Sequence, residues 1–382
     1  MHSSLLRPLA AGVVFALGVL SPQILRADAP KAGEPAKTVP VKPTTAAAKP
    51  AAVAEPAAAT QHVLAANALA KGDLTTPLFL CRADSGNVVR QNLESGSKKW
   101  LEPSQIFDNL YYVGNEFVGV LVLRTSAGLI LFDSSSSADE AEHRLVPGLV
   151  KLGLNPKDIK YVVVTHGHWD HFGGAAYLQQ TYAAKIALGA ADWDLIEKAP
   201  PHSLEASEHP IPKREIAVID GQKLTLGDTT VKLYVTPGHT PATVSAIVPV
   251  RDRGTPRTLS LYGSVAFPPS LEPTERVGGL RKYDQSVQRF ADISKQAGAV
   301  GILNTHVFAD GGLARLNALR TRKPSEPNPF LIGAEATSRY YGILHECLQA
   351  AQARPQVASD WSKPLVTPPA NTPAAAHSSK QH

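Results

Sequence analysis

The sequence contains only two cysteines, Cys81 and Cys347, and both are distant along the chain from every group of histidines. No local cluster therefore combines cysteine with histidine. In an oxidising compartment the two residues could form a disulfide, and otherwise they would be two buried thiols. The sequence leaves both alternatives open, because only geometry distinguishes them.

Dense runs of basic residues and long apolar segments are also absent from the 382 residues. The formal net charge of +5 comes partly from lysines and arginines near the two ends of the chain, which indicates ordinary solvation and argues against nucleic-acid binding. The apolar stretch Leu9–Leu20 is shorter than the roughly 20 residues that span a bilayer. We therefore expect no stable membrane insertion of the mature chain.

The first 29 residues have the pattern of a secretory signal peptide. Arg7 gives a basic opening, the apolar stretch Leu9–Leu20 follows, and small residues stand at Ala27 and Ala29. A retained membrane anchor is the weaker alternative. The prediction is a periplasmic or secreted protein whose exact cleavage site is not determined by the sequence.

Composition divides the rest of the chain into three parts. Residues 30–76 are rich in alanine and proline and predict a flexible linker. Residues 353–382 have a similar composition and predict a disordered tail. The folded domain is therefore expected at residues 77–352, and its strand-like runs alternate with helical segments in two successive halves.

Several helices and one long loop are specific expectations within this domain. Helices are predicted at about 283–297, 313–322 and 334–352. The segment 267–286, which reaches into the first of these helices, is predicted to be a long flanking loop. The proline-rich segment Pro200–Lys213 is long enough to be a functional loop, such as a lid.

The segment "THGHWDH", residues 165–171, places three histidines and an aspartate directly after the strand-like run 159–164. Burying so many imidazoles is costly unless a metal ion binds them. If the chain stays extended, His166, His168 and Asp170 point to one side, whereas His171 is out of step with them. One cluster can therefore contribute ligands to two metals.

Two later histidines also follow extended runs: His239 in "PGHT" and His306 in "NTH". Either one alone would more often be a structural histidine. Together with the cluster they complete two sets of three ligands, and three ligands leave a tetrahedral position open for water, as in catalytic zinc sites. The first set is His166, His168 and His239, and the second is Asp170, His171 and His306.

These three motifs together resemble the metallo-β-lactamase fold superfamily, whose signature is HxHxDH followed by two later histidines. The resemblance covers the whole predicted domain. It implies an α/β fold, a four-layer αβ/βα sandwich of two facing sheets with helices outside, and two Zn²⁺ ions at one edge held by the six residues above. It also implies that Asp133 orients a metal ligand.

One position separates the branches of this superfamily. Many of its hydrolases place a metal-bridging aspartate in the strand between the last two histidines, but here that strand reads "LSLYGSVAF" and Ser264 takes the place. This resembles subclass 3 of the class B β-lactamases. A second serine expected two residues later is replaced by Ala266. Three basic residues nearby are candidates for binding an anionic substrate or are ordinary solvated charges: Arg276, Arg281 and Lys282.

The resemblance implies an exported di-zinc hydrolase that opens cyclic amides, the β-lactams, with hydroxide made available by the two zinc ions. The catalytic candidates are Asp170, which binds metal and orients the water, and Ser264, by its position alone. No sequence context indicates an activated serine nucleophile. The alternatives are a metal-dependent hydrolase of another ester, lactone or thioester, and a catalytically weak zinc-binding protein. The expected partner is a small-molecule substrate, and the oligomeric state is undetermined.

Overall fold

The computed structural model describes residues 55–198, 209–264, 266–267 and 273–354. The predicted signal peptide, the first part of the predicted linker and residues 355–382 of the predicted tail lie outside these ranges. So does most of the segment predicted as a functional loop, residues 200–213. No helix in the described ranges combines the length and the apolar character that crossing a membrane requires.

The first sheet contains seven strands that follow one another in chain order. The strands β1 to β4 pair antiparallel, and β4 to β7 pair parallel. Their bounds are β1 Ser104–Phe107, β2 Leu110–Gly114, β3 Gly119–Thr125, β4 Gly128–Phe132, β5 Ile159–Val163, β6 Lys185–Gly189 and β7 Ile216–Val218. The β-branched run before the histidine cluster is thus a central strand, β5, as predicted.

The second sheet contains five strands in the order β12-β11-β10-β9-β8. Its pairs are antiparallel except for β11 and β12, which are parallel. The bounds are β8 Gln222–Leu226, β9 Thr229–Val235, β10 Val244–Asp252, β11 Thr255–Leu261 and β12 Ile302–Leu303. The last strand is only two residues long, but it is the one that leads to His306.

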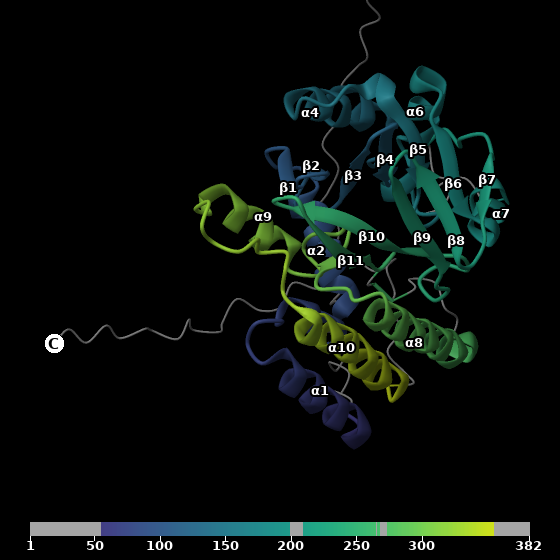
Figure 1. Cartoon of the computed structure of the whole chain (residues 1–382). Helices are drawn as coiled ribbons and strands as arrows, with labels where there is room; N and C mark the ends of the chain where they lie inside the picture. The colour runs from purple at the N-terminus through teal and green to yellow at the C-terminus, as the bar shows by residue number, and fades with distance from the viewer. Residues whose placement is uncertain (1–54, 199–208, 265, 268–272, 355–382) are drawn as a thin grey trace, which may run out of the picture. The chain divides into compact units, whose positions relative to one another are not determined.

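Helices cover the outer faces of both sheets (Figure 1). The α-helices are α1 Ala57–Ala70, α2 Ser85–Gly96, α3 Ala138–Glu140, α4 Val146–Lys151, α5 Trp169–Phe172, α6 Ala175–Tyr182, α7 Ala190–Lys198, α8 Pro273–Gln296, α9 Gly312–Thr321 and α10 Ala334–Gln352. Three short helical turns are η1 Thr76–Cys81, η2 Ala141–Leu145 and η3 Pro156–Asp158. The turn η2 has π geometry and joins α3 to α4, in which Pro147 is the second residue.

Three apolar clusters show that these elements form four layers. One cluster lies between the sheets and includes Leu121 of β3 and Val248 of β10. A second packs α4, α6 and α7 on the first sheet. A third packs α1, α8 and α10 on the second sheet. The predicted αβ/βα sandwich is therefore confirmed, because each sheet buries one face against the other sheet and one against helices.

The N-terminal boundary of the folded part lies earlier than the composition indicated. Residues 57–70, placed in the predicted flexible linker, form α1, which packs against α10 through Ala66 and Leu69. Asp73 beyond its end binds the guanidinium of Arg339 at 2.7 and 2.8 Å. The prediction was wrong here because an alanine-rich segment is also a strong helix former once a partner surface is available.

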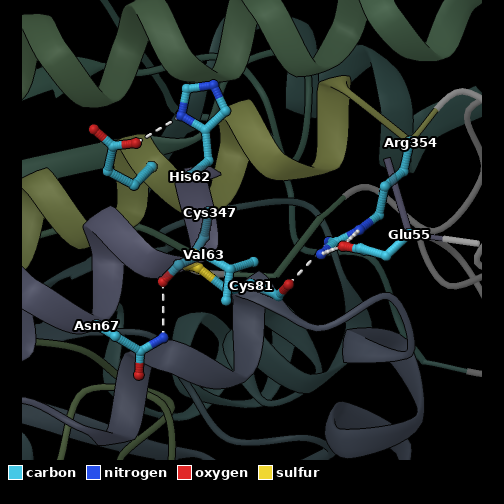
Figure 2. The surroundings of a disulfide bond; sticks show 8 residues. Glu55, His62, Val63, Asn67, Cys81, Cys347 and Arg354 are labelled. Carbon is cyan, nitrogen blue, oxygen red and sulfur yellow. Dashed lines mark hydrogen bonds and ion pairs between the residues drawn. A yellow bond between two sulfur atoms is a disulfide. The ribbon is translucent and has the colours of Figure 1, made fainter. Parts of the chain in front are cut away.

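Cys81 and Cys347 form a disulfide, which decides between the two alternatives that the sequence left open. The bond joins η1 to α10, and Figure 2 shows it beside α1, with Val63 and Asn67 nearby. Next to it, Arg354 donates to the carbonyl of Cys81 at 2.8 Å and pairs with Glu55 (Figure 2). The N-terminal segment is thus attached to the last helix by one covalent bond and several polar contacts.

The start of α8 is the other clear difference. This helix begins at Pro273, about ten residues before the predicted start, so Arg276, Arg281 and Lys282 lie on a helix and not in a loop. Its early part contains two consecutive glycines, Gly278 and Gly279, which lower helix propensity. The buried face made by Leu280, Tyr283 and Val287 packs on the second sheet and stabilises the helix despite this composition.

Candidate metal centre

The segment 165–171 begins in extended conformation and then turns into a short helix. His168 is extended (φ −90°, ψ 148°) and caps α5, which contains Asp170 and His171. The expected alternation of sides therefore holds only as far as His168, because a helical turn places successive side chains about 100° apart. As a result Asp170 does not share a side with His166 and His168, but lies with His171.

The first candidate group consists of His166, His168 and His239, whose ring nitrogens converge. His239 Nε2 lies 3.0 Å from His168 Nδ1. His166 Nε2 is buried and has no hydrogen-bond partner. The other ring nitrogens of His166 and His239 donate to the carbonyls of Gly263 and Ala266, at 3.1 and 2.8 Å. Each carbonyl fixes a tautomer that leaves Nε2 with a free lone pair.

Burial also keeps the imidazoles of His166 and His239 neutral. Desolvation lowers the pKa of His166 and His239 well below the ordinary value, and the neighbouring imidazoles lower it further. A neutral imidazole is the form that binds a metal ion. A buried imidazole nitrogen without a partner, such as Nε2 of His166, is costly unless a ligand occupies the space that it faces.

The second candidate group consists of Asp170, His171 and His306. The Nε2 atoms of the two histidines are 3.0 Å apart, and Oδ2 of Asp170 lies 3.4 Å from the first and 3.5 Å from the second. His306 donates from Nδ1 to the carbonyl of Phe117 at 3.0 Å. The two Nε2 atoms and the carboxylate oxygen therefore point at one another.

Asp133 orients the ring of His171 by binding the nitrogen opposite the one that faces the second group. Its Oδ2 accepts the Nδ1–H of His171 at 2.7 Å, and Asp133 itself is buried with a left-handed backbone (φ 68°). Burial lowers the pKa of His171, but the carboxylates of Asp170 and Asp133 outweigh it and raise the pKa to about 10. This is the orienting contact that the resemblance implied for Asp133.

Both groups fit a zinc ion. With Zn–N distances of about 2.0–2.1 Å, two ligands of a tetrahedral zinc lie roughly 3.3 Å apart. The separations of 3.0, 3.4 and 3.5 Å in the two groups are close to this value. Each group offers three donor atoms within 4.8 Å of one another, which leaves a fourth position for a water or a substrate. That these residues bind metal stays a prediction.

The comparisons with known proteins agree with this geometry. A family model described as the metallo-beta-lactamase superfamily matches residues 113–252. BJP-1, a subclass B3 metallo-beta-lactamase of Bradyrhizobium japonicum, is similar in structure with a TM-score of 0.56 and 30% sequence identity, over 65% of this chain and 92% of that chain. The chain belongs to the metallo-β-lactamase superfamily.

Curated relatives of this superfamily member match it over shorter stretches. The hydroxyacylglutathione hydrolase of Acidiphilium cryptum is 34% identical over 82 residues, which are 22% of this chain and 28% of that protein. An N-acyl homoserine lactonase of Bacillus sp is 31% identical over 114 residues, which are 30% of this chain and 42% of that protein. The matches thus span less than half of the length of each of these two relatives.

Four further residues were predicted near the site of this metallo-β-lactamase superfamily member, and they range from buried to exposed. Ser264 is buried, its hydroxyl has no hydrogen-bond partner, and its carbonyl accepts from Tyr283 at 3.0 Å. Arg276 is half-buried, and its Nε has no hydrogen-bond partner. Arg281 and Lys282 are exposed on α8, as ordinary solvated charges would be.

Several residues that contact the candidate ligands were not predicted. The carbonyls of Phe117, Gly263 and Ala266 accept from ring nitrogens, and a backbone carbonyl carries no sequence signal. Asp192, in the first turn of α7, is also buried next to the site. In the sequence it is one acidic residue near the start of a helix, which is where acidic residues are common for reasons of the helix dipole.

Proposed function

We propose that this chain is a di-zinc hydrolase of the subclass B3 type that opens the cyclic amide of β-lactams. The observation that carries the proposal is the pair of three-residue groups at the edge of the two sheets, five histidines and one aspartate. Among the described residues that form these groups, Asp170 is the only carboxylate. The absence of a carboxylate at Ser264 supports the lactamase type over hydrolases with a bridging aspartate.

His166, His168 and His239 would hold one zinc ion, and Asp170, His171 and His306 would hold the other. Bound zinc supplies a coordinated water of lowered pKa and polarises the carbonyl of the substrate. The chain supplies the orientation. The acceptors that fix the outward-facing ring nitrogens are Asp133 and the carbonyls of Phe117, Gly263 and Ala266.

Asp170 stays ionised in this arrangement. Burial would raise the pKa of its carboxyl group, but His171, His306 and His168 outweigh burial and lower it below the ordinary value. A carboxylate can accept a hydrogen bond from a water that attacks the substrate, and so orient it. Apolar side chains shield the second group from bulk water on the side of His306. The rings of Phe117 and Phe308 stack beside this histidine, with their centroids 5.6 Å apart.

A second candidate substrate class is an ester, a lactone or a thioester. The similarity to a hydroxyacylglutathione hydrolase and an N-acyl homoserine lactonase supports it. Ala266 supports it too, because a serine that would bind a β-lactam carboxylate is missing there. The two candidates share the metal centre and differ only in the substrate that the flanking residues accept.

The purified protein should hydrolyse nitrocefin, and a chelator should abolish the reaction. A lactone and a thioester are assayed beside it. His166→Ala should lower kcat/KM by at least about a thousandfold, because zinc and its water are lost, whereas the exposed His143→Ala is the matched control and should keep full activity. Hydrolysis of the lactone or thioester alone supports the second class. Full nitrocefin hydrolysis by His166→Ala rejects the site.

We also propose that the protein is exported. The signal-peptide pattern of residues 1–29 supports export, and so does the disulfide between Cys81 and Cys347, because such bonds persist in oxidising compartments. Export would bring the enzyme to the compartment in which β-lactams act. Fractionation of cells that express the full chain, followed by immunoblotting, tests this.

A further inference from the structure

Asp192 connects the two loops that carry the first group of candidate ligands. Its Oδ2 accepts from the backbone N–H of Gly167 at 2.9 Å and from the hydroxyl of Thr240 at 2.6 Å. Its Oδ1 accepts from the backbone N–H of Ala242 at 2.7 Å. Gly167 lies between His166 and His168 in the sequence, and Thr240 follows His239 directly.

The environment of this carboxylate leaves it little freedom. Asp192 is fully buried, and a buried carboxylate is stable only when hydrogen bonds replace its hydration. The backbone packs closely around it, since a Cβ on Gly189 would lie 2.1 Å from the carbonyl of Ala242. The junction of β6 and α7 is therefore a rigid support on which the loop 165–171 and the loop 239–242 are both fastened.

Asp133 is a second buried aspartate that accepts hydrogen bonds next to the candidate ligands, in this case beside the second group. Its Oδ1 accepts from the N–H of Thr165 at 2.7 Å, and its Oδ2 accepts from the hydroxyl of Thr165 at 3.1 Å and from His171 at 2.7 Å. The two buried aspartates thus come from different places in the fold: Asp133 directly follows β4, and Asp192 lies in α7. Both bond to the loop 165–171, but only Asp133 contacts His171 directly, and only Asp192 also bonds to the loop that follows His239.

We propose that Asp192 is a positioning residue that sets the metal affinity of the group His166, His168 and His239, separately from that of Asp170, His171 and His306. The distance between His168 and His239 depends on two loops that are far apart in the sequence, and Asp192 is bonded to both. Replacing a group that orients a metal ligand typically costs about 10–100-fold in metal affinity.

Asp192→Asn tests the proposal, because an amide cannot accept from Gly167 and Ala242 at once without turning its NH₂ toward one of these donors. The substitution is made in two backgrounds that each keep one metal site. In His306→Ala, which keeps the first group, it should weaken Zn²⁺ binding about 10–100-fold. In His239→Ala, which keeps the second group, it should change the affinity less than about threefold. Zn²⁺ affinity is measured by competition with a chromophoric chelator, and Co²⁺ absorption spectra report the coordination of the remaining site.

Two further variants separate positioning from general stability. Asp284→Asn changes another buried aspartate, which accepts one side-chain hydrogen bond within α8 and two from α10, and it should lower the melting temperature without changing either zinc affinity. Asp133→Asn should weaken Zn²⁺ binding more in the background that keeps the second group, because Asp133 accepts directly from the ligand His171. Its effect on the first group should be smaller, because it reaches His166 only through Thr165. Equal losses in both backgrounds, or unchanged zinc affinity in Asp192→Asn, overturn the proposal.

The inference rests on the metal centre of the proposed function but not on its substrate. Zinc binding by the protein without these substitutions is therefore measured first. If it binds two zinc ions and Asp192→Asn behaves as expected, the inference stands even where no β-lactam is hydrolysed. If the unsubstituted protein binds no zinc, the proposed function fails, and the inference fails with it.

Discussion

Gly174 follows the metal-binding segment at a point where no side chain fits. A Cβ at this position would lie 2.0 Å from the carbonyl oxygen of Ser134, a backbone atom that cannot turn away. Ser134 in turn donates from its N–H and its hydroxyl to the carbonyl of His171, at 2.9 and 2.8 Å. A displacement of Ser134 therefore reaches a candidate metal ligand directly.

Gly174→Ala should lower the free energy of unfolding by about 1–3 kcal/mol, the usual cost of forcing extra atoms into a packed site, and should weaken zinc binding as well. Urea denaturation and zinc titration measure the two effects. Gly278→Ala is the matched control, since a Cβ there meets nothing within 4 Å on the interior of α8. That substitution should stabilise the protein by roughly 0.5–1 kcal/mol. A fully stable Gly174→Ala variant contradicts the expectation.

The ligand residues could be found from the sequence because their chemistry is local. "THGHWDH" concentrates donors after a strand, and His239 and His306 each follow an extended run, so a shared sheet edge predicts that they meet. Asp192 could not be found in this way. Its partners, Gly167 and Ala242, donate from the backbone, and their hydrogen bonds depend on a contact between loops that only the folded chain forms.

At the scale of elements, a hydrogen bond between two titratable side chains, a histidine and an aspartate, joins the helices α8 and α10. His345 of α10 lies 2.6 Å from the carboxylate of Asp284 of α8, which also accepts from Gln288 and Gln349. The hydrogen bond to Asp284 is the main cause that raises the pKa of His345 above its ordinary value of 6.5, against the opposing effect of burial. The strength of this contact between α8 and α10 therefore depends on pH.

The raised pKa means that the folded state binds the proton of His345 more tightly than the unfolded state does. The resulting stabilisation is fully present below the unfolded pKa, about 6.5, and is lost as the pH rises through the higher folded pKa. The free energy of unfolding of the unsubstituted protein should therefore exceed that of His345→Gln most at about pH 5.5 and least at about pH 9. Urea denaturation of both proteins across this range measures the difference. A difference that does not change with pH would show that the ion pair contributes nothing.

The sequence predicted elements well wherever a single pattern decides them. The helix α10 was expected at its observed bounds, and β5 corresponds to the strand-like run expected at residues 159–164. Elements whose stability comes from a distant partner were missed or displaced: the start of α8, which the second sheet supports, and α1, which packs on α10. Neither partner surface can be recognised from the local sequence, because it forms only in the folded chain.

The extent of the folded part is a property of the whole molecule. Composition placed the boundary at residue 77, whereas the structure has α1 and the turn after it packed against α10 through Ala66, Leu69 and Leu74. The guanidinium of Arg339 lies under this segment and bonds to Asp73 and to the carbonyl of Leu69. A chain that begins at residue 77 would leave that apolar surface and that guanidinium without their partners.

Two truncated chains distinguish the boundaries. A chain that begins at residue 55 should unfold with the same free energy as the chain without its first 29 residues. A chain that begins at residue 77 should be less stable by at least about 2–3 kcal/mol, because burial of one leucine alone contributes about that much. Thermal and urea denaturation measure the loss, and both truncated chains keep Cys81 and Cys347, so the disulfide is constant between them. Equal stability of the two truncated chains would show that α1 is a dispensable appendage and that the boundary predicted from composition was right.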